Sequence, residues 1–258
     1  MSAPDPRSTQ TFDLPTGRMR RSARPAGVAR THVGAVRSRN EDRFLARPEV
    51  GLWAVADGMG GHSLGDVASG LLVDNLSEVT PCGSGHALLS SVKGRLAHVN
   101  RELRERARTM APGAVMGSTI VVLVVFDGHC AFVWAGDSRG YRLRRGRLER
   151  MTTDHRMVQR LVDAGAIAAS DASGHPWANV ITRAVGADET LEPETHFDSL
   201  EDDDIFLLAS DGLTDVLDDG EISRILADQP LDGAADALLA LALARGAPDN
   251  VTFVLTRV

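Results

Sequence analysis

The chain has 258 residues, of which 43% are hydrophobic and 24% are charged, a composition typical of a globular protein with one large core. Its 28 basic and 35 acidic residues give a net charge of −7, which argues against a general nucleic-acid binder, because such proteins need a positive surface. Cys82 and Cys130 form neither a metal-ligand spacing nor a disulfide framework, which fits a reducing cytoplasm. The longest apolar run, residues 120–126, is too short to span a membrane. We therefore expect a cytoplasmic protein without a membrane span.

Residues 1–30 are rich in arginine and interrupted by prolines, and they contain no apolar core of the kind found in signal peptides. We predict that they form a flexible basic arm and that a single domain follows over residues 31–258. The composition of the arm favours a solvated tail over a segment that contacts an acidic partner.

The first strand signal of the domain is the apolar stretch 51–56, which runs into Asp57-Gly58. Two amphipathic helices are predicted next, because apolar residues recur at helical spacing over residues 68–79 and 89–103. The β-branched run 120–126 ends in Asp127-Gly128, and together with residues 130–135 it predicts a hairpin.

A second hairpin is predicted over residues 141–151, and residues 162–178, which are long and weakly periodic, are typical of a surface flap near a site. The apolar stretch 205–210 then ends in Asp211-Gly212, and residues 250–258 supply a last strand. Pairs of strands followed by pairs of helices favour an α+β layered sandwich over a doubly wound parallel sheet.

Carboxylates recur where these predicted strands begin or end, at Asp57, Asp211 and Asp249. A single Asp-Gly is a common turn dipeptide, so each position taken alone is a weak signal. Together they indicate a site for hard divalent cations, and the absence of a paired His or Cys set favours magnesium or manganese over zinc. Two such ions could lower the pKa of a bridging water and shield the oxygens of a phosphoester during attack.

Seven short segments, taken in order, resemble the signature blocks of the metal-dependent protein phosphatases of the PPM type (type 2C-like), in their bacterial serine/threonine phosphatase branch. The segments are 36–42, 55–62, 117–119, 135–139, 153–155, 209–213 and 248–251. The resemblance covers about residues 31–258. It implies a four-layer αββα sandwich with two central, mainly antiparallel sheets and flanking helices, which agrees with the layered sandwich predicted above.

The resemblance also implies the ligands of the ions, which would be manganese or magnesium, two ions with a weaker third. Asp57 resembles the bridging ligand and the Gly58 carbonyl a ligand of one ion, whereas Asp211 and Asp249 resemble ligands of the other. The remaining acids in the matching motifs are Glu41 and Asp42, which resemble a pair that reaches metal-bound water, and Asp137, which resembles a ligand of the third ion.

For catalysis, the resemblance implies that Arg37 orients the phosphate and that Asp57 holds both ions. His62 is the candidate general acid, although animal members of the family place a histidine directly after Asp-Gly, where this chain has Met59. Asn250 is expected to brace Asp249. Supporting structural roles are expected for four other motif residues, namely Thr119, Asp154, His155 and Arg183.

The function that the resemblance implies is hydrolysis of phosphoserine and phosphothreonine in proteins by a hydroxide that bridges two cations, reversing a serine/threonine kinase. The partners would be phosphorylated proteins, and we expect a monomer. One alternative is a non-catalytic phosphoprotein-binding module, whose sequence would lack one of the ligand aspartates; none is lacking here. Another alternative is a phosphatase of small metabolites, and a nucleoside-triphosphate enzyme is disfavoured because the chain has no phosphate-binding Gly-Lys-Ser/Thr loop.

Overall fold

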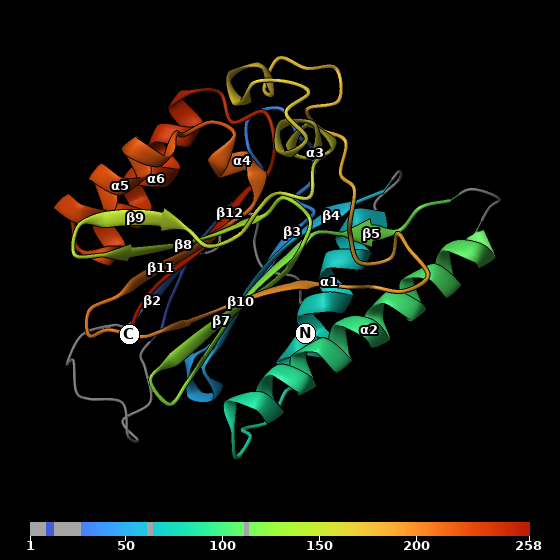
Figure 1. Cartoon of the computed structure of the whole chain (residues 1–258), viewed down its shortest axis with the longest axis horizontal. Helices are drawn as coiled ribbons and strands as arrows, with labels where there is room; N and C mark the ends of the chain where they lie inside the picture. Colours follow the sequence, from blue (N-terminus) through green and yellow to red (C-terminus); the bar gives the residue numbers. More distant parts are fainter. Residues whose placement is uncertain (1–8, 13–26, 61–63, 111–113) are drawn as a thin grey trace.

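Four layers make up the protein in a computed structural model that describes residues 9–12, 27–60, 64–110 and 114–258. Two antiparallel sheets face each other in the middle, and helices cover the outer face of each sheet (Figure 1). The α+β fold class and the αββα layering predicted from the sequence are therefore confirmed.

The first sheet joins strands from both ends of the chain, in the order β1-β2-β12-β11-β8-β9. The C-terminal strand β12 pairs with β2 on one side and with β11 on the other. The strands are β1 (Thr9–Phe12), β2 (Gly27–His32), β8 (Arg139–Arg144), β9 (Arg147–Arg150), β11 (Ile205–Ala209) and β12 (Val251–Arg257).

The second sheet has the order β10-β7-β6-β4-β3, with the two-residue strand β5 paired to the end of β4. The predicted hairpin of residues 120–135 forms the β6–β7 pair at its centre. The strands are β3 (Asp42–Arg47), β4 (Leu52–Met59), β5 (Gly117–Ser118), β6 (Ile120–Phe126), β7 (His129–Ala135) and β10 (Glu194–Ser199).

Helices α1 (Leu64–Ser77) and α2 (Gly85–Met110) pack on the second sheet, and α5 (Asp219–Asp228) and α6 (Leu231–Ala244) pack on the first. The shorter elements are η1 (Pro48–Val50), α3 (Met157–Asp163), η2 (Ala169–Asp171) and α4 (Asp211–Thr214). None of the helices in the described ranges has the length and apolar character needed to cross a bilayer.

Alternation along the strands explains how one sheet serves two cores. Successive side chains of a strand point to opposite faces. In β4, Trp53 and Val55 are fully buried against the first sheet, whereas Leu52 and Ala54 are fully buried under α1 and α2. Every residue from Leu52 to Ala56 is therefore inaccessible to solvent, and β4 is held rigidly where it delivers Asp57.

Residues 27–30 belong to the first sheet and not to an arm. Val28 and Ala29 are completely buried, and the buried Arg30 donates a hydrogen bond to Asp236 of α6 at 2.9 Å. The density of arginine in this part of the sequence concealed the strand. Upstream of β2, the structure describes only residues 9–12 of the predicted arm, which form β1.

The segment predicted as a flap, residues 162–178, starts in the last turn of α3 and includes η2. Its side chains are mostly exposed, and Trp177 is 52% exposed. In Figure 1, α3 and this segment lie at the same end of the sandwich as α4.

Candidate active site

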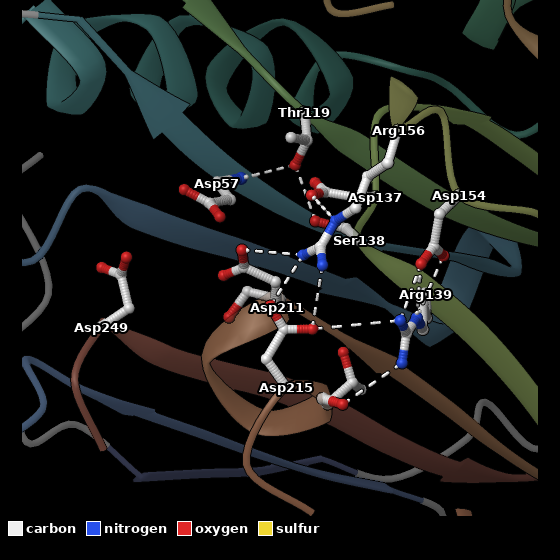
Figure 2. Close-up of polar contacts among 12 residues, drawn as sticks. Asp57, Thr119, Asp137, Ser138, Arg139, Asp154, Arg156, Asp211, Asp215 and Asp249 are labelled. Atoms are coloured by element: carbon white, nitrogen blue, oxygen red, sulfur yellow. Dashed lines mark hydrogen bonds and ion pairs between the residues drawn. The ribbon is translucent and has the colours of Figure 1, made fainter. Parts of the chain in front are cut away.

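Aspartates from separate segments gather at one end of the sandwich (Figure 2). Asp42 and Asp57 lie directly opposite each other in the β3–β4 ladder. Asp137 follows β7, Asp211 is the first residue of α4 after β11, and Asp249 precedes β12. The strand-end positions that the sequence singled out are thus brought to one end by the antiparallel pairing.

Burial and mutual repulsion oppose ionisation of these groups. Burial raises the pKa of Asp42 to about 8 and that of Asp211 to about 7. The pKa of Asp57 is raised well above its ordinary value, first by burial and then by the charges of Asp42 and Asp211. Burial also raises the pKa of Asp137 and of Glu41. The site therefore has more negative charge than its own cations neutralise.

Two carboxylate oxygen atoms of this cluster have no hydrogen-bond partner although they are buried, Oδ1 of Asp42 and Oδ1 of Asp137. The other oxygen of Asp42 accepts a hydrogen bond from the Ser210 hydroxyl at 2.8 Å. Buried polar atoms are normally satisfied, so unpartnered oxygens amid excess negative charge match the chemistry of a site for a hard divalent cation.

Arginine side chains neutralise part of the negative charge of the cluster. Arg37, whose side chain is 58% exposed, donates to Asp249 Oδ2 at 2.6 Å, and Arg156 contacts Asp137, Asp211 and Asp215. With the side chains in these positions, no three Asp, Glu, His or Cys side chains within the described ranges are spaced to hold one ion.

Gly58 lies in close contact with the start of α1. A Cβ atom at this position would lie 2.0 Å from the carbonyl oxygen of Gly65 and 2.8 Å from that of Glu41, so only glycine fits. The Gly58 N–H also donates to the Glu41 carbonyl at 3.2 Å. The segment that contains Glu41, the end of β4 and the first turn of α1 are therefore packed as one unit.

Thr119 connects the Asp57 and Asp137 segments. Its N–H donates to the Asp57 carbonyl at 2.8 Å, and its hydroxyl group shares a 2.7 Å hydrogen bond with that of Ser138. Gly136 has a φ of 122°, and a Cβ there would lie 2.4 Å from Cβ of Thr119. This packing fixes the backbone on either side of the cluster, which is the supporting role predicted for Thr119.

Asn250 contacts Asp249 through its main-chain N–H, which donates to Oδ1 at 2.8 Å. Its side chain donates to the carbonyls of Val33 and Arg39 and accepts from the N–H of Glu41. Asn250 thus ties the head of β12 to the segment that carries Arg37 and Glu41.

His155 also has a supporting position. Its Nδ1 accepts a hydrogen bond from the Gly136 N–H at 3.0 Å, and its ring stacks on Trp134. Burial lowers the pKa of the imidazole, and the neighbouring Arg183 guanidinium lowers it further. A neutral His155 therefore holds the backbone that presents Asp137. The remaining candidate, His62, lies outside the described residues.

Three charged residues of the site, Arg139, Arg156 and Asp215, were not predicted from the sequence. Arg139 forms a two-pronged ion pair with Asp154, with distances of 3.0 and 2.7 Å, and lies 3.9 Å from Asp215. Two sequence signals were available: Asp215 is four residues after Asp211, and Arg156 directly follows Asp154-His155.

A family model described as protein phosphatase 2C matches residues 26–251. The serine/threonine protein phosphatase PstP of Mycobacterium tuberculosis is 36% identical over 231 residues, which are 90% of this chain and 44% of that protein, so the chain spans less than half of this relative. PppA, described as a key regulatory component of T6SS in Pseudomonas aeruginosa, has a solved structure with 42% identity and a TM-score of 0.83, and the match covers 90% of this chain and 97% of PppA. The catalytic domain of PstP in complex with two manganese ions is 35% identical, with a TM-score of 0.77 and the same coverages.

Proposed function

Since the chain belongs to the protein phosphatase 2C family, we propose that it hydrolyses phosphoserine and phosphothreonine in proteins and requires two divalent cations. The observation that carries this proposal is the buried cluster of aspartates with unbalanced negative charge, beside the exposed guanidinium of Arg37. The names of the bacterial relatives support the substrate class. The substrates would be proteins phosphorylated by a serine/threonine kinase.

The proposed ligands are Asp57, the carbonyl of Gly58, Asp211 and Asp249, with Glu41 and Asp42 as further acids close to the ions. Manganese or magnesium fits this all-oxygen set, and the manganese complex of the PstP catalytic domain supports the choice. When bound, such ions acidify water and screen the charge of the phosphate oxygens. Asp137 is not included in this set, because Arg156 contacts it at 2.5 Å and both side chains are largely buried.

Arg37 would bind the phosphate. Its side chain is exposed and is held at 2.6 Å from one oxygen of Asp249, which places a planar, two-pronged donor at the rim of the acidic cluster. The leaving serine or threonine alkoxide also needs a proton, and we keep His62 as the proposed donor because its ordinary pKa lies near neutrality.

Arg37→Ala is expected to lower kcat/KM for a phosphopeptide by about 10- to 100-fold, because the phosphate loses a charged hydrogen-bonding partner. The matched control is Arg39→Ala, which removes the same charge from an exposed side chain two residues away. Steady-state kinetics with both variants would check this. Equal losses in the two variants would mean that only general charge attraction is involved.

The proposed function is tested by phosphate release from phosphoserine and phosphothreonine peptides with Mn²⁺, after chelation, and after Mn²⁺ is added back. We expect chelation to abolish turnover and Mn²⁺ to restore it, because the carboxylates alone cannot neutralise the phosphate. Sugar phosphates assayed in parallel should give a much lower kcat/KM. Turnover that survives complete metal removal would refute the proposal, and a preference for sugar phosphates would favour the metabolite phosphatase.

A further inference from the structure

The guanidinium of Arg156 lies among three carboxylates from two parts of the chain, the segment after β7 and α4 (Figure 2). Its Nε atom is 2.5 Å from Asp137 Oδ2, and Nη2 is 3.2 Å from Asp211 Oδ2. Both terminal nitrogens also reach Asp215, at 3.2 and 2.9 Å. A single positive group thus joins the segment after β7 to both ends of α4.

We infer that Arg156 is a built-in cation that takes the place of a divalent ion between Asp137 and Asp211. The inference rests on the proposed function, because it concerns which carboxylates of the cluster bind metal ions and which pair with arginine side chains. On this assignment, Asp137 is neutralised by the protein itself, and the ions are confined to the Asp57 and Asp249 side of the cluster.

The position of Arg156 is firmly fixed by its surroundings. Its side chain is only 10% exposed and that of Asp137 only 2% exposed, so both groups are largely removed from water. A planar guanidinium with several donors matches carboxylates at fixed distances better than an ammonium does. Its main chain is also anchored, since Arg156 forms an isolated β-bridge with Ile181 immediately before α3.

A divalent ion on the contacted oxygen of Asp137 would have to displace this guanidinium, and an ion on the other oxygen, Oδ1, would lie close to its positive charge. Displacement would leave a buried arginine without its partners, which is strongly unfavourable. Asp211 is held less tightly, because Arg156 Nη2 lies 3.2 Å from its Oδ2 and its side chain is 26% exposed, whereas Arg156 Nε lies 2.5 Å from Oδ2 of Asp137, whose side chain is 2% exposed. Asp211 can therefore serve Arg156 and an ion together, whereas the contacted oxygen of Asp137 is committed to Arg156.

The arginine side chains are also distributed unevenly over the cluster. The part of the cluster around Arg156 contains two guanidinium groups, because Arg139 pairs with Asp154 and approaches Asp215. On the other side, neither Asp42 nor Asp57 has a hydrogen bond or ion pair with an arginine among the described residues, and the two lie directly opposite each other in the β3–β4 ladder. Uncompensated negative charge, which attracts divalent ions, is thus concentrated away from Asp137.

The test is to measure Mn²⁺ binding to the full chain by equilibrium dialysis and calorimetry, after the metal has been stripped from the protein. Arg156→Gln is expected to bind about one more Mn²⁺ per chain than the wild type, because an all-oxygen site is freed at Asp137. Arg156→Gln combined with Asp137→Asn is expected to return to the wild-type count. The matched control, Arg160→Gln, removes the same charge from an exposed position one turn further along α3 and should leave the count unchanged.

If Arg156→Gln does not fold, as judged by circular dichroism, Arg156→Lys replaces it, and the additional Mn²⁺ should then bind more weakly because one ammonium still competes. Folded Arg156 variants with the wild-type count and affinity would overturn the inference. So would an extra ion that persists when Asp137→Asn is added. Failure of the proposed function looks different, since the wild type itself would then bind no Mn²⁺ or would hydrolyse phosphopeptides without it.

Discussion

Asp57→Asn is expected to lower kcat/KM for a phosphopeptide by at least about 10³-fold and, in metal-free protein, to raise the thermal unfolding temperature. Activity falls because the proposed bridging ligand loses its charge. Stability rises because burial and the charges of Asp42 and Asp211 oppose ionisation of Asp57, and a neutral amide of similar shape removes that repulsion. The expected gain is about 1–3 kcal/mol.

Asp154→Asn is the matched control for the stability measurement, because Asp154 is also a buried acid but is paired with Arg139. Its replacement weakens an ion pair and leaves Arg139 short of a partner, so the unfolding temperature of the metal-free protein should fall. Differential scanning fluorimetry in chelator would give both values. A fall for both variants would mean that Asp57 has a structural role.

Gly58→Ala is expected to destabilise the protein by about 3 kcal/mol and to abolish most of its phosphatase activity. The new methyl group would lie 2.0 Å from the Gly65 carbonyl oxygen, so the start of α1 must move away from β4. This movement would also disturb Glu41, whose carbonyl accepts the Gly58 N–H. Urea unfolding and the phosphopeptide assay would measure the two effects.

The control for this substitution is Gly70→Ala in α1, the helix that Gly58 contacts, because the structure leaves free space around the added methyl group. Alanine is the better helix former, so this variant should be more stable by about 0.5–1 kcal/mol. If Gly58→Ala unfolded at the same urea concentration as the wild type, the contact between β4 and α1 would have to be looser than described.

The sequence was sufficient to predict the positions of the site residues that lie near strand ends. Asp57, Asp211 and Asp249 each lie within two residues of the end of an apolar strand, and antiparallel pairing brings such positions to a common end. Asp42 could also be placed near Asp57, through the family resemblance. The α+β layered sandwich was predictable because periods of two and of 3.6 residues mark strands and helices locally, whereas the αββα order of the layers was implied by the family resemblance.

The contacts of Arg156 could not be predicted, because they join residues that are 19, 55 and 59 positions apart and depend on how the segments pack. The local signal, that Arg156 directly follows Asp154-His155, does not show which carboxylates the side chain contacts. The strand β2 was missed for a related reason, because Arg30 is stabilised by Asp236, a residue near the other end of the chain.

The opposition of Asp42 and Asp57 in the β3–β4 ladder has a consequence for engineering the protein. Like charges directly opposite each other weaken a sheet, and natural sequences keep such a feature only where function compensates for it. A selection for thermostable variants carried out in chelator would therefore favour the replacement of these aspartates. The selected variants would be more stable but would lack phosphatase activity. The same selection with Mn²⁺ in the buffer should retain them, because the bound ions would make the acids stabilising.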